Sequence, residues 1–231
     1  MKADTYAKLV ILETLIDAEI GHFLEHRPAS ADRFREGIVS RVSDLVDQID
    51  ALDAVAAARV YDAIVDFLAE LPEDDEGIVE ATLRFKRAVD RIVARGMEAR
   101  DLDQPSTWAV VLDELLDELA DEYHDAVRPG GEVRPREYLR AQFLLDRARE
   151  SAERILWTGD RKGAAELRDE MDRLHFAVRS RRLRAVEVDQ LIRGPQRWAA
   201  RYRPSTLSRV GAFVIGQLLR RPRPRREPRG S

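Results

Sequence analysis

The chain has 231 residues, of which 44% are hydrophobic and 35% are charged, and its 39 Lys and Arg nearly balance its 43 Asp and Glu for a formal net charge of -4. This composition is too hydrophobic for a wholly disordered chain, and the length is that of one or two domains. The absence of cysteine excludes disulfides, thiolate nucleophiles and thiolate metal sites.

The hydrophobic pattern is helical nearly throughout and predicts an all-α, antiparallel bundle of about eight helices. In residues 106–127, the clearest case, Trp108, Val111, Leu115 and Leu119 recur at the spacing of one helix face. No β-branched alternation is long enough to predict a strand. Breakers such as Pro28, Pro72 and Gly159 separate the segments. The expected helices are 3–26, 31–52, 54–71, 76–99, 106–127, 136–157, 160–192 and 205–220.

The first expected helix has apolar residues nearly all round, so we expect it to be largely enclosed. Glu13 and Asp17 then fall on the same side as Val10 and Ile20, which makes them candidate buried carboxylates. An isolated buried charge is unfavourable, so each must be paired, protonated or metal-bound. The favoured interpretation is ion pairing to arginines of the fourth helix, such as Arg84, Arg87 and Arg91, and a functional acid pair is the alternative.

Residues 128–135, with two glycines and two prolines, form the candidate boundary between domains. We expect a five-helix acidic bundle over residues 1–127 and a long helical hairpin packed on it over residues 136–192. The Gly-Asp-x-x-x-Ala turn of this hairpin, Gly159 to Ala164, resembles that of tetratricopeptide-like helix pairs, although one pair is not a repeat array. A basic and apolar helical segment is expected over 193–219, followed by a disordered basic tail over 220–231.

Three carboxylates each precede a histidine by three residues, as in the Glu-x-x-His motif of ferritin-like di-iron bundles. The pairs are Glu19 with His22, Asp121 with His124, and Asp172 with His175. At about 100° per residue, His124 falls outside the apolar face of its helix, among Asp113 and Asp117, and is expected to face water.

Two further matches to helical enzymes are short. His124-Asp125 resembles the dipeptide of HD-type phosphohydrolases, and Arg168 with His175 resembles the Arg-x6-His spacing of HEPN-type RNases. No Gly-rich phosphate loop, nucleophile elbow or His-Glu-x-x-His motif is present. We therefore assign no catalytic residue, metal ligand or cofactor, and a metal-binding carboxylate and histidine bundle enzyme stays an alternative.

The near-neutral total charge conceals a separation along the chain: residues 1–127 carry -17, residues 128–175 carry +1 and residues 176–231 carry +12. Within the basic part, an uncharged apolar run extends from Val210 to Leu219. A helix of ten residues is about 15 Å long, too short to cross a hydrocarbon core of about 30 Å. The candidate contacts with an anionic partner are Arg197, Arg201, Arg203, Arg209, Arg220, Arg221, Arg223, Arg225 and Arg226. The candidate residues for apolar docking or a membrane interface are Trp198, Tyr202, Val210, Phe213, Val214 and Leu218.

Three interpretations of this segment compete: docking onto the bundle, contact with an anionic membrane surface, and contact with nucleic acid. In a version of the first, the basic end covers part of the acidic half of the same chain. The favoured function is a non-catalytic interaction or adaptor protein whose basic C-terminal segment contacts an anionic partner, another protein or a membrane surface. A nucleic-acid-associated protein is an alternative, and a homo-oligomer is compatible with the sequence. Charged residues interrupt the N-terminal apolar stretch, so we expect a cytoplasmic protein, with or without peripheral membrane association.

Overall fold

The computed structural model describes residues 1–26, 31–69, 74–128, 132–158, 161–181 and 184–203. Within these ranges the chain is helical, and its one β-type contact is an isolated bridge between Val127 and Val133. The all-α class predicted from the sequence is confirmed, whereas the disordered tail predicted over 220–231 and the helix predicted over 205–220 lie outside the described residues. The helices are α1 (Ala3–His26), α2 (Ala31–Leu52), α3 (Ala54–Ala69), α4 (Asp75–Gly96), α5 (Ala99–Leu102), α6 (Pro105–Ala126), α7 (Pro135–Thr158), α8 (Arg161–Ser180) and α9 (Ala185–Ala200).

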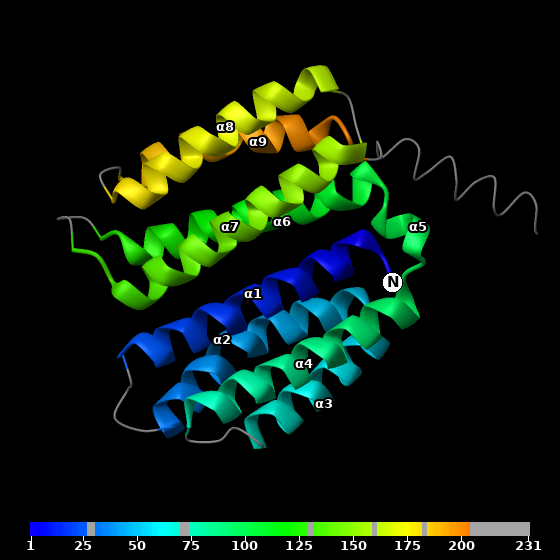
Figure 1. Cartoon of the computed structure of the whole chain (residues 1–231), viewed down its shortest axis with the longest axis vertical. Helices are drawn as coiled ribbons and strands as arrows, with labels where there is room; N and C mark the ends of the chain where they lie inside the picture. The colour runs from blue at the N-terminus through cyan, green and yellow to red at the C-terminus, as the bar shows by residue number, and fades with distance from the viewer. Residues whose placement is uncertain (27–30, 70–73, 129–131, 159–160, 182–183, 204–231) are drawn as a thin grey trace, which may run out of the picture.

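The helices pack as two groups of four (Figure 1). In the first group α1, α2, α3 and α4 each contact the next, and α4 returns to α1. In the second, α6 packs on α7, α7 on α8 and α8 on α9, while α9 returns to α6. The short α5 leads from the first group to the second, and α1 also packs against both α6 and α7.

Helix α1 has a central position because it contacts α2 and α4 on one side and α6 and α7 on the other. A helix surrounded on several sides needs apolar residues all round its axis. Accordingly, Leu9, Ile11, Leu12 and Ile16 are all buried although they project in different directions. The enclosure expected for the first helix is therefore observed.

Helices α6 and α7 share the most extensive packing between any two described helices, and the expected domain boundary at 128–135 lies between them. Tyr123 of α6 and Tyr138 of α7 are both buried, with ring centroids 6.4 Å apart, and the Tyr138 hydroxyl donates a 2.6 Å hydrogen bond to the Val178 carbonyl of α8. The hydrophobic core is thus continuous across residues 128–135. The division of the chain into domains stays a prediction.

The single helix predicted over residues 160–192 is wrong, because the structure divides it into α8 and α9. After α8 ends at Ser180, Arg181 adopts a left-handed backbone with φ of 55°, and its guanidinium lies 4.4 Å from the centroid of the Tyr138 ring. The next helix begins with a capping interaction in which the Arg184 N–H donates a 2.8 Å hydrogen bond to the Glu187 carboxylate. This break turns α9 back along α8.

Candidate functional site

Three polar contacts join α9 and the residues just after it to α6, and their order along the chain shows that the two helices are antiparallel. Arg203, just after α9, lies 2.5 Å from Asp113, and Gln196 donates a 2.6 Å hydrogen bond to Asp117. At the other end of α9, Asp189 lies 2.8 Å from His124 Nε2. Part of the basic C-terminal region therefore covers an acidic face of α6, as in the intramolecular version of docking expected from the charge distribution.

Trp198, a candidate for docking or membrane contact, is 4% exposed and belongs to the hydrophobic core. Its ring stacks on Tyr202 with centroids 4.6 Å apart. Gly163 of α8 permits this packing, since a Cβ at that position would lie 3.0 Å from the Trp198 Nε1 atom. Trp198 thus packs on its own bundle and presents no surface to a partner.

The candidate arginines have different environments in the structure. Arg203 pairs with Asp113, and Arg201 lies 3.8 Å from Glu166 of α8, so carboxylates of the same chain already accompany both guanidinium groups. Arg197 is exposed on α9. The remaining candidates lie outside the described residues: Arg209, Arg220, Arg221, Arg223, Arg225, Arg226, Val210, Phe213, Val214 and Leu218.

The two candidate carboxylates of α1 line a cavity of about 470 Å³ between α1, α4 and α7. Asp17 accepts a 2.5 Å hydrogen bond from Lys86 of α4, so the pairing cation is this lysine and not one of the arginines expected on that helix. The pKa of Glu13 is raised to about 7, mainly by burial; Arg147 and Lys86 lower it, whereas Asp90 and Asp17 contribute to the rise. Both carboxylates are half-buried, so Glu13 exchanges a proton near neutral pH in a partly solvated site.

Sequence reasoning missed the most deeply buried ionic cluster, which joins α1, α2, α6 and α7. Glu19 and Glu122 are 3% and 1% exposed. Arg136 donates two hydrogen bonds from Nε to Glu19, at 3.1 and 2.9 Å, and Arg140 donates a third at 2.6 Å. Arg140 also lies 3.6 Å from Glu122, which is ion-paired with Arg41 as well. Each buried carboxylate thus has two guanidinium partners.

The chemistry of this cluster is that of a structural ion-pair network. Burial raises the pKa of Glu122, while Arg140 and Arg41 act in the opposite direction. The sequence signal available for Glu19 was its place in the enclosed first helix, but its spacing to His22 suggested a metal motif instead. No simple pattern links Glu19 to Arg136 and Arg140, which are more than 100 residues away in the chain.

In the part of the chain that the structure describes, no group of three or more His, Asp or Glu could hold a metal ion. The described residues therefore give no support to the alternative of a metal-binding enzyme. His124 is 52% exposed, as its facing predicts, and it contacts Asp189. Arg168 donates hydrogen bonds to Glu153 of α7. His175 lies 3.9 Å from Asp146, and its pKa is lowered by burial and by nearby Arg149 and Arg179.

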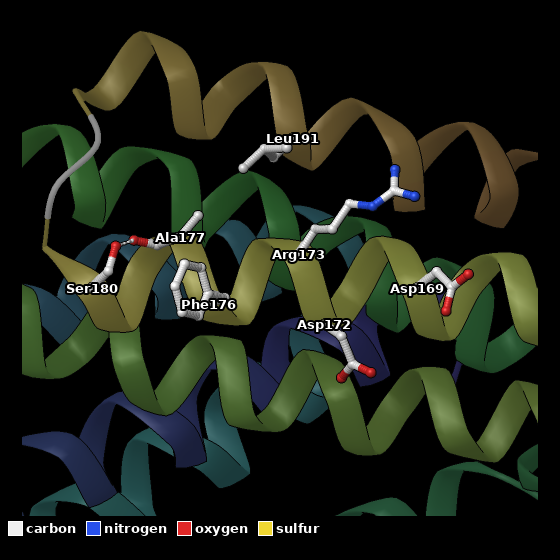
Figure 2. A pocket seen from close by; sticks show the side chains of 7 residues that line it. All are labelled: Asp169, Asp172, Arg173, Phe176, Ala177, Ser180 and Leu191. Carbon is white, nitrogen blue, oxygen red and sulfur yellow. Dashed lines mark hydrogen bonds between the residues drawn. The ribbon is translucent and has the colours of Figure 1, made fainter.

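An open groove of about 650 Å³ lies along α8 and is bordered by α9 (Figure 2). The Phe176 side chain is 75% exposed there, and Leu191 projects from α9 on the other side. A hydrogen bond from the Ser180 hydroxyl to the Ala177 carbonyl uses the only polar hydrogen of that serine side chain. The lining residues are Asp169, Asp172, Arg173, Phe176, Ala177, Ser180 and Leu191.

No family model, curated protein or solved structure matches the chain. Among the described helices, none combines the length and apolar character needed to cross a membrane.

Proposed function

We propose that this protein is a non-catalytic helical adaptor whose C-terminal segment, residues 204–231, binds an anionic membrane surface. The observation that carries the proposal is the change of charge at the end of the described chain. Residues 204–231 contain seven arginines and one glutamate, for +6, whereas residues 1–203 account for -10 of the total of -4. A basic segment is thereby joined to an acidic helical body.

The contacts of α9 limit which residues serve this function. Trp198 is buried, and Arg201 and Arg203 already lie beside carboxylates of the same chain. The body therefore anchors the segment at Arg203, and binding falls to the residues that follow. These are Arg209, Arg220, Arg221, Arg223, Arg225 and Arg226, together with Val210, Phe213, Val214 and Leu218.

The combination of arginines with an apolar face favours a membrane surface over nucleic acid. Val210, Phe213, Val214 and Leu218 have the i, i+3, i+4 and i+8 spacing of one helix face. Such a face inserts at the headgroup level, and each nearby arginine adds about 1 kcal/mol of attraction to anionic lipid. Phosphates of nucleic acid would engage the arginines but would leave these apolar residues without a role.

Sedimentation of the full chain with phosphatidylserine-containing vesicles tests the proposal. Replacing Arg221, Arg223 and Arg225 together by Gln should weaken binding on the order of 100-fold, because three arginines at about 1 kcal/mol each are removed. The matched control replaces the exposed Arg87, Arg91 and Arg95 of α4 by Gln, which changes net charge equally and should leave binding nearly unchanged. Equal losses in the two variants, or no binding by the unmodified chain, would contradict the proposal.

A further inference from the structure

The groove of Figure 2, which we call the α8–α9 groove, contains apolar side chains that lie next to one another. Phe176 is 75% exposed, more than any other large apolar side chain in the described part of the chain, and Ala177 and Leu191 lie beside it. Asp169 and Arg173 are charged residues at the border of the groove. Contiguous exposed apolar side chains are typical of an interaction surface, whereas single ones are not. The groove is therefore suited to an apolar segment.

The last described residues of the chain lie close to one end of this groove. Arg201 lies 3.8 Å from Glu166, near the beginning of α8. At about 100° per residue, Glu166 is on the same side of α8 as Arg173, Ala177 and Ser180, which line the groove. In Figure 1 the beginning of α8 and the end of α9 lie at the same end of the second group of helices. The chain therefore leaves α9 on the side of α8 where the groove begins.

The chain between Arg203 and the apolar run is long enough to return to the groove. It consists of residues 204–208, which reach about 20 Å when extended. Gly194 of α9 lies beside Glu170 of α8, because a Cβ at Gly194 would clash with the Glu170 carboxylate. From Gly194 to Arg203 the chain advances by nine residues, about 14 Å along the axis of a helix. Residues 204–208 can therefore extend back to the level of Asp169, where the groove begins.

We infer that residues 210–219 of the same molecule bind in the α8–α9 groove. Four apolar residues of this segment have the spacing of one helix face: Val210, Phe213, Val214 and Leu218. In the groove this face covers Phe176, and removal of the phenyl ring from water stabilises the contact. Because the segment returns from the end of α9, it runs beside α8 in the same direction as α8. Attachment to the same chain also gives it a high effective concentration at the groove.

The groove and the segment match in length and in charge. From Asp169 to Ser180 the groove follows α8 for about 17 Å, and ten helical residues extend about 15 Å. Arg209, the last residue before the apolar run, then lies near the exposed Asp169. The arginines that follow Leu219 extend past the end of α8 and are not needed for this contact.

This inference does not depend on membrane binding, because it concerns a contact between two parts of the protein in the absence of lipid. Where both hold, the same apolar face of residues 210–219 contacts the groove in solution and the lipid surface at a membrane. The two contacts then exclude one another, and membrane binding requires the segment to leave the groove.

Because the chain has no cysteine, engineered disulfides can report the contact in the full-length protein. The test pair is Ser180→Cys, in the groove, with Gln217→Cys, since Gln217 shares its helix face with Phe213. The control pair combines Gln217→Cys with His175→Cys, because His175 is half-buried like Ser180 but faces Asp146 of α7, on the other side of α8. Under mild oxidation without lipid, the test pair should form an intramolecular disulfide at least about tenfold faster than the control pair. Equal rates, or disulfides that join two molecules, would overturn the inference.

A second comparison tests the role of Phe176 in the protein that carries the test pair of cysteines. Phe176→Ser should slow intramolecular crosslinking about tenfold, because the segment loses the ring on which it packs. Tyr61→Ser is the matched control: Tyr61 is an aromatic residue of α3 that is 59% exposed and lies outside the groove, so the crosslinking rate should not change. An equal effect of the two variants, or none from Phe176→Ser, would overturn the role of the α8–α9 groove.

Discussion

The Nε atom of Arg140 donates a 2.6 Å hydrogen bond to Oε1 of Glu19, which joins α7 to α1 across the boundary between the two groups of helices. The same guanidinium lies 3.6 Å from Glu122 of α6. Arg140 therefore holds two buried carboxylates that would repel each other without it. Such networks fix the relative position of helices even where their net contribution to stability is small.

Arg140→Met should destabilise the fold by about 3 kcal/mol, because it leaves Glu19 and Glu122 with one guanidinium partner fewer in a buried site. Urea unfolding measures the loss. Arg149→Met is the control, since Arg149 is exposed and pairs with the exposed Asp172, and it should change stability by about 1 kcal/mol or less. Similar losses in the two variants would refute the structural role of the network.

Gly37→Ala should destabilise the protein by about 1–3 kcal/mol, although alanine is the better helix former. A Cβ at Gly37 of α2 would clash with Nη2 of Arg136 and would displace that guanidinium from Glu19. In an Arg136→Met background the same change should be neutral or stabilising. A double-mutant cycle checks this coupling, and additive effects would disprove it.

The stability of the Glu13→Gln variant, relative to that of the unmodified protein, should increase as the pH rises from about 4.5 to 7. The folded-state pKa of Glu13 is raised to about 7 from its ordinary value of 4.5, mainly by burial. Its contribution to stability is therefore fully present below pH 4.5 and is lost as the pH rises through 7. We expect a relative gain of about 1–2 kcal/mol at pH 8, reduced from the full value by partial exposure of the site. Unfolding titrations at several pH values measure this difference, and a constant difference would exclude the raised pKa.

Helical periodicity was sufficient to predict the fold class and most helices, because regularly spaced apolar residues are a local signal. The all-round apolar character of α1 also predicted its enclosure. The break after Ser180 was not predicted because it depends on Arg181, and the Tyr138 ring that the Arg181 guanidinium contacts is distant in sequence. The Glu187 cap was a local signal, but Arg184 is not a usual N-cap residue.

The candidate site was harder to predict because charge partners depend on tertiary packing. The acidic and basic parts of the chain were evident from composition, yet nothing local indicates that Arg203 pairs with Asp113. Trp198 among arginines suggested a surface role, whereas its indole packs beside Gly163. The charge pattern thus indicated a candidate region of the chain but not which of its residues already contact the helical body.

Trp198→Phe should destabilise the protein by about 1–2 kcal/mol, because the smaller ring leaves space beside Gly163 and Tyr202. Its affinity for anionic vesicles should stay within about twofold of that of the unmodified chain, since the indole is buried and does not contact lipid. Thermal unfolding and vesicle sedimentation provide the two measurements. A large loss of vesicle binding without a loss of stability would contradict this expectation and would indicate that Trp198 contacts the membrane.

The most direct test of the proposed function is the affinity for anionic vesicles of the full chain and of a chain from which Val210–Ser231 is deleted. The full chain should bind, and its affinity should fall as salt increases, because arginines outside the body supply the attraction. The shortened chain should retain its helical circular dichroism and lose vesicle binding. Binding that is unchanged by the deletion would contradict the proposal that the C-terminal segment is the membrane contact.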